Sequence, residues 1–200
     1  MKAIIFANGH IGNLDLIRPL TKDADIIIAA DGGYDIAIKL DLNPHYLVGD
    51  LDSIQTPIDK IKNTEIISYD RKKDYTDLEL ALIKAKELGA IKIFTATGGG
   101  IDQTICNVLM LAAYKNACII DETGIIWVTT SKLTINGNIG DTISLIPIET
   151  CTGITTAGLE YPLNNETLFA ATSRGISNVM TATTATIAIK SGKIIVVKRF

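Results

Sequence analysis

Aspartates follow several apolar segments of this sequence at the points where those segments end. Asp31 comes directly after the segment 25–30, and Asp50 and Asp52 follow the segment that ends at Val48. These segments have the length and the apolar composition of buried strands. Because ligands of an open parallel sheet bind outside the carboxyl ends of its strands, we expect the aspartates to converge on one crevice. Carboxylates packed together repel one another unless some are protonated or a cation lies among them.

More polar residues stand at the ends of later apolar segments. Asp70 and Asp74 follow the segment 65–69, and a later segment is followed by Gly98–Gly100 and then by Asp102. Oxygen ligands without histidine or cysteine suit Mg²⁺, which commonly also binds substrate phosphates. The pattern therefore predicts a magnesium–phosphate site formed by aspartates.

Some of these motifs also have structural explanations, and both interpretations stay open. Asp31 could be the N-cap of the helix that follows it. Thr76 and Glu79 have the spacing of a capping box, with Asp77 well placed on the helix dipole. A capped helix N-terminus can also bind phosphate. The glycine triplet at 98–100 is weak evidence, because it matches neither the Walker A pattern nor the dinucleotide-binding fingerprint.

Several other residues could take part in chemistry, but each has a simpler explanation. The basic run Arg71–Lys73 could meet phosphate charge, although such a run is more often solvated. We expect Cys106 to lie in the apolar face of a helix and Trp127 to belong to a core. We expect His10 to be a loop residue.

The elements that must position these residues form two groups. Before residue 122, strands alternate with helices, which predicts a mostly parallel sheet covered on both faces. The expected strands are 2–7, 25–30, 46–48, 65–69 and 92–96, and the expected helices are 14–22, 34–40, 77–88 and 102–115. We therefore expect an α/β fold whose residues 1–122 form a parallel-sheet domain that carries the magnesium–phosphate site.

After residue 122 the helical periodicity fades, and Thr, Ile, Val and Gly dominate. This pattern predicts that residues 123–200 form a C-terminal antiparallel β-sandwich domain. The expected strands are 125–130, 132–135, 142–147, 184–190 and 194–200. Ser191-Gly192 is a turn signal between the last two, which we expect to form a hairpin.

The composition excludes several classes of protein. The 200 residues carry a net charge of −3, so no basic field for nucleic acid is expected. No apolar run approaches the roughly 20 residues of a membrane span. The first apolar run stops at Asn8, which is too early for a signal peptide. The three cysteines lack metal-type spacing, so we expect reduced thiols in a cytoplasmic protein.

The sequence contains, in order, the motifs Asn8-Gly9, Asp31-Gly32-Gly33, Gly49–Ser53, Asp74–Asp77, Gly98–Gln103, Gly153-Ile154, Gly158–Leu163 and Ser173–Asn178. Together they resemble those of the thiamine pyrophosphokinase family over nearly the whole chain. The resemblance implies an α/β catalytic domain for nucleotide and metal over residues 1–122, a thiamine-binding β-sandwich over residues 123–200, and transfer of diphosphate from ATP to the hydroxyl of thiamine. It also implies a homodimer that binds thiamine between one subunit's α/β domain and the partner's β domain.

The resemblance assigns roles residue by residue. It makes Asp50 and Asp52 the Mg²⁺ ligands and counts them, with Asp77 and Asp102, as the catalytic carboxylates. It places around ATP the residues Asp31, Gly32, Asp74, Thr76, Gly98, Gly99 and Gln103. It places Ser177 and Asn178, in the second domain, near the pyrimidine of thiamine.

One departure from the family leaves alternative functions open. Gly100 stands where the family often has Arg, which removes a bidentate phosphate donor. The loss favours a non-catalytic thiamine- or nucleotide-binding regulatory homologue. A phosphotransferase that acts on another small alcohol is a further alternative. The sequence retains all five acidic positions that match the family, at residues 31, 50, 52, 77 and 102. They argue against the regulatory protein, because a protein that only binds anionic phosphates gains little from uncompensated carboxylates.

Overall fold

The computed structural model describes residues 1–10, 12–86, 89–114 and 116–200. They divide into two compact units, Met1–Glu122 and Thr123–Phe200. Within the described parts of the chain, no helix has the length and apolar character needed to span a membrane.

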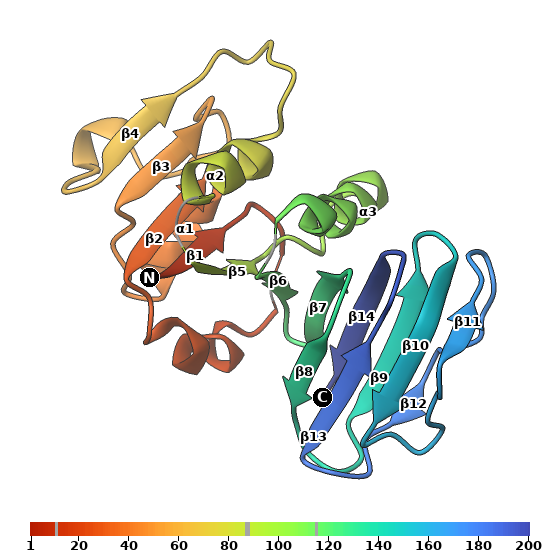
Figure 1. The fold of residues 1–200 in the computed structure, drawn as a ribbon. Helices are drawn as coiled ribbons and strands as arrows, with labels where there is room; N and C mark the ends of the chain where they lie inside the picture. The colour runs from red at the N-terminus through yellow and green to blue at the C-terminus, as the bar shows by residue number, and fades with distance from the viewer. Residues whose placement is uncertain (11, 87–88, 115) are drawn as a thin grey trace. The chain divides into compact units, whose positions relative to one another are not determined.

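The first unit is built on a parallel sheet with the strand order β6-β5-β1-β2-β3-β4 (Figure 1). The strands are β1 (Lys2–Phe6), β2 (Ile26–Ala30), β3 (Tyr46–Gly49), β4 (Glu65–Ser68), β5 (Ala90–Phe94) and β6 (Ala117–Ile120). The central strands β1 and β2 are each buried at four of their five positions. Such continuous burial is typical of parallel strands that are covered on both faces, and it confirms the predicted α/β fold.

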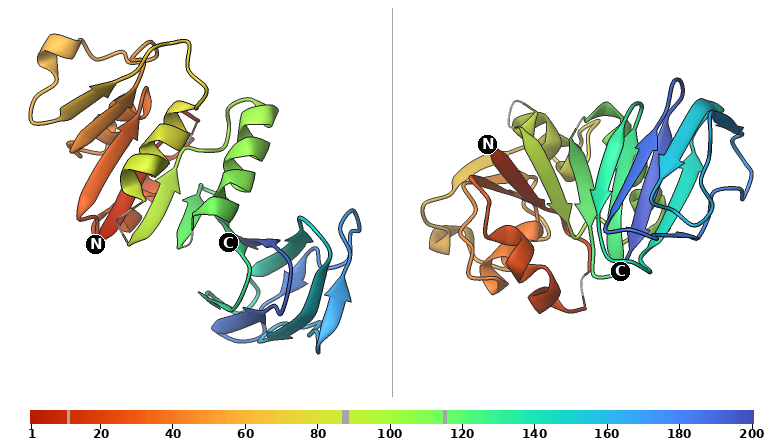
Figure 2. Two further views of the ribbon diagram at one scale, coloured as in Figure 1. Left: turned by 45° about the horizontal axis from the view of Figure 1, so that its top comes forward. Right: turned by 60° about the horizontal axis from the view of Figure 1, so that its bottom comes forward.

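Helices cover the two faces of this sheet. The chain places β2, β3 and β4 on one side of β1, and then returns to place β5 and β6 on the other side. Right-handed crossovers therefore put α1 (Gly33–Lys39) on one face, and α2 (Asp77–Ala85) and α3 (Ile101–Met110) on the other, as Figures 1 and 2 show. The strand order reverses at β1, which is where an open sheet leaves a crevice for ligands.

The predicted helix over 14–22 is wrong. That segment forms two short 3-10 helices, η1 (Leu14–Leu16) and η2 (Arg18–Thr21), and a third, η3 (Ile58–Lys60), lies between β3 and β4. Pro19 explains the break, because proline has no N–H to donate to the carbonyl one turn earlier.

The other differences in the first unit concern the ends of elements and one strand that was not predicted. α2 ends at Ala85 and α3 at Met110, where the 3-10 helix η4 (Leu111–Ala113) continues the chain. Leu88 and Lys115, the predicted helix ends, lie outside the described residues. The four-residue strand β6 was not among the predicted strands.

The second unit consists of two antiparallel sheets with the orders β12-β9-β14-β7 and β11-β10-β13-β8. The strands are β7 (Gly124–Thr129), β8 (Leu133–Asn136), β9 (Thr142–Pro147), β10 (Cys151–Ala157), β11 (Glu166–Leu168), β12 (Asn178–Val179), β13 (Thr184–Ala188) and β14 (Ile194–Arg199). Buried side chains from both sheets, such as Ile143, Val196, Ile154 and Ile187, form one core. The predicted β-sandwich is therefore confirmed, and the partly buried Trp127 packs against this core.

The predicted hairpin between the last two strands is wrong. β13 pairs with β10 and β8, whereas β14 pairs with β7 and β9. The turn at Ser191-Gly192 thus carries the chain from one sheet to the other. Both strands still bury alternate apolar side chains, because each covers the same core from its own side.

Candidate functional site

A cleft of about 570 Å³ lies at the carboxyl ends of β1, β2, β3 and β5. Five acidic side chains line it: Asp31, Asp50, Asp52, Asp77 and Asp102. They come from segments far apart in the sequence, and the parallel sheet brings the ends of these segments together. The positional argument made from the sequence is therefore correct for Asp31, Asp50, Asp52 and Asp102, whereas Asp70 and Asp74 are not among the described residues that line the cleft.

Of the other residues expected around the nucleotide, some line the cleft and some do not. Thr76, Gly99 and Gln103 line the cleft. Gly98 and Asp74 are not among the described residues that line the cleft. Gly32 borders an adjoining cavity of about 260 Å³, which shares Asn8, Gly9 and Ser53 with the cleft.

Three of the five carboxylates form a tight group at the floor of the cleft. Asp31, Asp50 and Asp77 each offer one carboxylate oxygen, and these oxygens lie within 4.8 Å of one another. Asp31 follows β2, is 4% exposed, and is held by its N–H, which donates to Val48 O at 2.9 Å. Helix α1 begins two residues later with Gly32 as its N-cap, so Asp31 is not that cap.

The end of β3 allows the three carboxylates to approach each other. Gly49, its last residue, has a φ of +150°, and a Cβ there would lie 3.0 Å from Asp77 Oδ1 and 3.2 Å from Asp31 Cβ. A side chain at this position would therefore push against both neighbouring aspartates.

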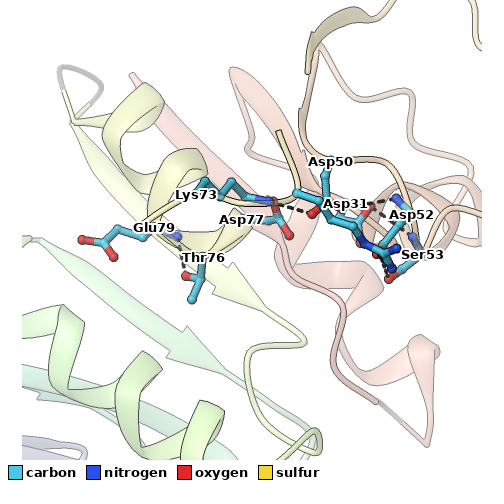
Figure 3. Close-up of polar contacts among 9 residues, drawn as sticks. Asp31, Asp50, Asp52, Ser53, Lys73, Thr76, Asp77 and Glu79 are labelled. Carbon is cyan, nitrogen blue, oxygen red and sulfur yellow. Dashed lines mark hydrogen bonds and ion pairs between the residues drawn. The ribbon is translucent and has the colours of Figure 1, made fainter. Parts of the chain in front are cut away.

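A lysine lies between two of these carboxylates (Figure 3). The Nζ atom of Lys73 is 2.7 Å from Asp50 Oδ2 and 3.1 Å from Asp77 Oδ1. The hydrogen bond from Lys73 lowers the pKa of Asp50, and Asp50 in turn raises the pKa of Lys73. Burial raises the pKa of Asp77, because its charged form is shielded from water. Its Oδ1 atom contacts Lys73 as an ion pair but receives no well-directed hydrogen bond from any described residue.

The sequence left two interpretations of the basic run 71–73, which were contact with negative charge and simple solvation. Its other two residues differ in this respect. Arg71 forms an ion pair with Asp52, which also accepts a hydrogen bond from Ser53 Oγ at 3.0 Å. Lys72 is exposed. Two of the three basic side chains thus face carboxylates, a pairing that their sequence positions did not reveal.

The donor set fits a hard divalent cation. Three carboxylate oxygens converge within the reach of one ion, and one of them, Asp77 Oδ1, is buried without a well-directed hydrogen bond from any described residue. Mg²⁺ prefers such oxygen ligands and usually keeps part of its water shell. Asp52 lies outside this group of three and forms an ion pair with Arg71.

Helix α2 begins at the cleft, and its start follows the predicted cap. Thr76 is the N-cap, and its hydroxyl oxygen accepts a hydrogen bond from Glu79 N at 3.2 Å. Asp77 then occupies the first helical position, where the helix dipole favours negative charge. The predicted N-cap is therefore confirmed, and both Thr76 and Asp77 also line the cleft.

Helix α3 provides the opposite wall of the cleft, and one prediction about it is wrong. Cys106 is exposed and lines the cleft instead of lying in a core. Among its described residues α3 has no buried position, so its apolar residues are not packed as the sequence suggested. Asn107, which the sequence did not single out, donates from Nδ2 to Ala96 O at 2.8 Å and so ties α3 to the loop after β5.

The two residues expected near thiamine lie in the second unit and differ in exposure. Ser177 is exposed, with a φ of +57°. Asn178 is buried, and its amide is occupied by Tyr161: Oδ1 accepts from Tyr161 N at 3.0 Å, and Nδ2 donates to Tyr161 O at 2.8 Å. Asn178 therefore fixes the backbone at Tyr161, whose ring is exposed.

Comparison with known proteins places both units in one group. A family model described as "Thiamin pyrophosphokinase, catalytic domain" matches residues 17–120, and one described as "Thiamin pyrophosphokinase, vitamin B1 binding domain" matches residues 128–194. No curated protein sequence matches the chain significantly.

Solved structures show the same likeness over the full length. Thiamine pyrophosphokinase from Bacillus subtilis is 26% identical, with a TM-score of 0.87, over 100% of this chain and 99% of that one. Thiamin pyrophosphokinase from Geobacillus thermodenitrificans is also 26% identical, with a TM-score of 0.84, over 100% and 98% of the two chains. The Candida albicans enzyme is 19% identical, with a TM-score of 0.80 over 100% and 90%, and shares the fold.

Proposed function

The chain belongs to the thiamin pyrophosphokinase family and is an enzyme, a thiamine diphosphokinase, and we propose that Mg²⁺ and ATP bind in its acidic cleft. In this reaction the diphosphate of ATP moves to the hydroxyl of thiamine, giving thiamine diphosphate and AMP. The observation that carries the proposal is the convergence of Asp31, Asp50 and Asp77 at the strand ends.

The three converging carboxylates are the proposed holders of the metal. Mg²⁺ bound there would neutralise negative charge on the phosphates of ATP, and phosphoryl chemistry depends mainly on such neutralisation and on positioning. Asp52, two residues after Asp50, remains a candidate ligand and would first have to separate from Arg71.

Other groups of the cleft would position the triphosphate. The hydroxyl oxygen of Thr76 accepts the N–H of Glu79, so its own hydrogen remains available for a phosphate oxygen. The N-terminal turn of α3 begins at the cleft, where Gly99 and Gln103 line it, and its backbone N–H groups would be donors for a bound phosphate. These donors would partly replace the arginine that the family often has at the position of Gly100.

The hydroxyl of thiamine must lose a proton as it attacks phosphorus, and we assign that proton to Asp102. This carboxylate lines the cleft but lies outside the group of three, and it forms no ion pair within the described residues. Asp102→Asn should therefore lower kcat by about 100-fold or more while Mg²⁺ binding is unchanged. If Asp102→Asn lost Mg²⁺ binding to the same extent as kcat, we would instead assign Asp102 to the metal site.

The second unit is the proposed thiamine-binding part of a homodimer. Ser177 and the loop that Asn178 fixes at Tyr161 would contact the pyrimidine of thiamine. The three cysteines are free thiols, which suits a cytoplasmic enzyme.

A product assay tests the reaction directly. Purified protein is incubated with thiamine, ATP and Mg²⁺, and the products are separated by chromatography. Thiamine diphosphate with AMP is the expected result, whereas ADP would indicate transfer of a single phosphoryl group. Asp50→Asn should abolish turnover without unfolding the protein, and turnover that survives this change would refute the metal assignment.

A further inference from the structure

Lys73 occupies the place where the proposed metal would have to bind. Its ammonium lies between Asp50 and Asp77, and the side chains of Lys73 and Asp50 are each only 13% exposed. We propose that Lys73 is a tethered counter-ion, which holds the acidic group together in the metal-free enzyme and must leave it when a cation binds. This inference rests on the proposed metal site and adds a competitor that belongs to the chain itself.

The charges of the group require such a counter-ion. Three carboxylates whose oxygens lie within 4.8 Å repel each other strongly in a partly dehydrated cleft. Lys73 contributes one positive charge directly to two of them, and Arg71 contributes another to Asp52. The segment between β4 and α2 therefore neutralises much of the site before any ligand arrives.

The ammonium and a divalent cation cannot occupy this position together. Lys73 Nζ is 2.7 Å from Asp50 Oδ2, so it uses the same carboxylate that the metal requires. A cation among the three oxygens would also lie within a few ångströms of the ammonium, where like charges repel. Since Lys73 stands four residues before Asp77 in the chain, its displaced side chain would remain near the acidic group and near Thr76, which we propose to position the triphosphate.

Removing the competitor should strengthen cation binding in the absence of nucleotide. Mn²⁺ binding is measured by isothermal titration and by electron paramagnetic resonance for the wild type, Lys73→Met and Lys72→Met. Lys72 is exposed and adjacent, so Lys72→Met makes the same change of net charge away from the acidic group. We expect Lys73→Met to bind Mn²⁺ about tenfold more tightly than the wild type, and Lys72→Met to differ by less than about twofold.

A thermal measurement gives an independent readout. Without metal, Lys73→Met should unfold at a lower temperature than the wild type, because its carboxylates lack the counter-ion. Millimolar Mg²⁺ should raise the Tm of Lys73→Met more than the Tm of the wild type. In the double variant Asp50→Asn/Lys73→Met this additional rise should disappear, which assigns it to the acidic group.

Each opposite outcome overturns the inference. Equal Mn²⁺ affinity of Lys73→Met and Lys72→Met would show a general effect of charge without displacement, and weaker binding would make Lys73 a support of the metal site. If Lys73→Met does not fold, Lys73→Gln keeps a hydrogen-bond donor for Asp50 and carries the same expectations. The product assay for the reaction is separate, so turnover with unchanged Mn²⁺ affinity would refute this inference and leave the proposed function intact.

Discussion

Gly49 lacks a side chain at the point where Asp31 and Asp77 approach the backbone of β3. We predict that Gly49→Ala destabilises the protein and weakens Mn²⁺ binding, because the new Cβ would lie 3.0 Å from Asp77 Oδ1 and the φ of +150° suits glycine. Gly140→Ala is a matched control, since Gly140 also has a positive φ, of +99°, but has nothing within 4 Å of its Cβ position.

The two substitutions separate backbone strain from contact with the acidic group. Both should lower the free energy of unfolding, by about 1 kcal/mol for strain alone, and Gly49→Ala should cost more. Chemical unfolding and Mn²⁺ titration measure the two effects. Normal Mn²⁺ affinity in Gly49→Ala would mean that the three carboxylates do not depend on this gap.

The cysteines differ in their environments, which predicts the order in which they react. Burial raises the pKa of Cys118 to about 11, and burial also raises that of Cys151. The thiolate is the reactive form, so at pH 8 both should react with iodoacetamide far more slowly than the exposed Cys106. Peptide mass spectrometry over time gives the three rates.

Because Cys106 lines the cleft, bound MgATP should slow its alkylation. The rates of Cys118 and Cys151 serve as the internal reference. An unprotected Cys106, in protein that turns over ATP, would place the nucleotide away from α3.

At the scale of residues, the sequence was informative about the carboxylates and uninformative about their partners. The positions of Asp31 and Asp50 directly after apolar segments were sufficient to predict one acidic cleft. The pairing of Lys73 with Asp50 spans 23 positions and depends on the path of a loop, which local patterns do not encode. Cys106 was misassigned because an apolar helix was assumed to be packed on a core.

The start of α2 combines a structural and a proposed catalytic role in one hydroxyl. We predict that Thr76→Ala lowers the free energy of unfolding by about 1 kcal/mol through loss of the N-cap, and also lowers kcat/KM. Thr76→Ser keeps the hydroxyl and should restore both quantities. Recovery of stability without recovery of kcat/KM would show that the methyl group of Thr76 matters to the substrate.

At the scale of elements, continuous apolar strands and long amphipathic helices were predictable, and short or polar elements were not. β1 and β2 have almost uniformly apolar residues. β10, with the sequence Cys-Thr-Gly-Ile-Thr-Thr-Ala, and the two-residue β12 lack such a signal and form because neighbouring strands pair with them. The false hairpin at Ser191-Gly192 arose because a turn signal does not specify which sheet the next strand joins.

At the scale of the whole molecule, the second unit contains a buried ion pair that should make its stability depend on pH. Lys198 Nζ lies 3.1 Å from Asp141 Oδ2, and the two side chains are 7% and 9% exposed. The N–H of Asn138 and the ammonium of Lys198 hold the pKa of Asp141 below its usual value, although burial opposes them. This stabilisation is complete above the ordinary carboxyl pKa of about 4 and is lost as the pH falls through the lower native pKa.

Asp141→Asn should accordingly cost about 3 kcal/mol at pH 7, because a buried ammonium loses its partner. The difference from the wild type should shrink as the pH falls below about 4. Urea unfolding followed by the fluorescence of Trp127, the single tryptophan, reports on this unit. Asp23→Asn is the control: it breaks an exposed ion pair with Lys2 and should cost less than about 1 kcal/mol at any pH. An effect of Asp141→Asn that does not change with pH would contradict the role of the buried pair.

β14 is the last strand along the chain, yet it lies between β7 and β9 and pairs with both. On the ribosome, residues 1–122 can complete their own sheet while the rest is still being made. The second unit cannot, because the edges of β7 and β9 stay unpaired until β14 emerges from the exit tunnel. Its nascent form therefore displays the unpaired edge of β7, and later also that of β9, until Ile194–Arg199 has been made and has left the tunnel. Slow codons between β9 and β14 would prolong this exposure.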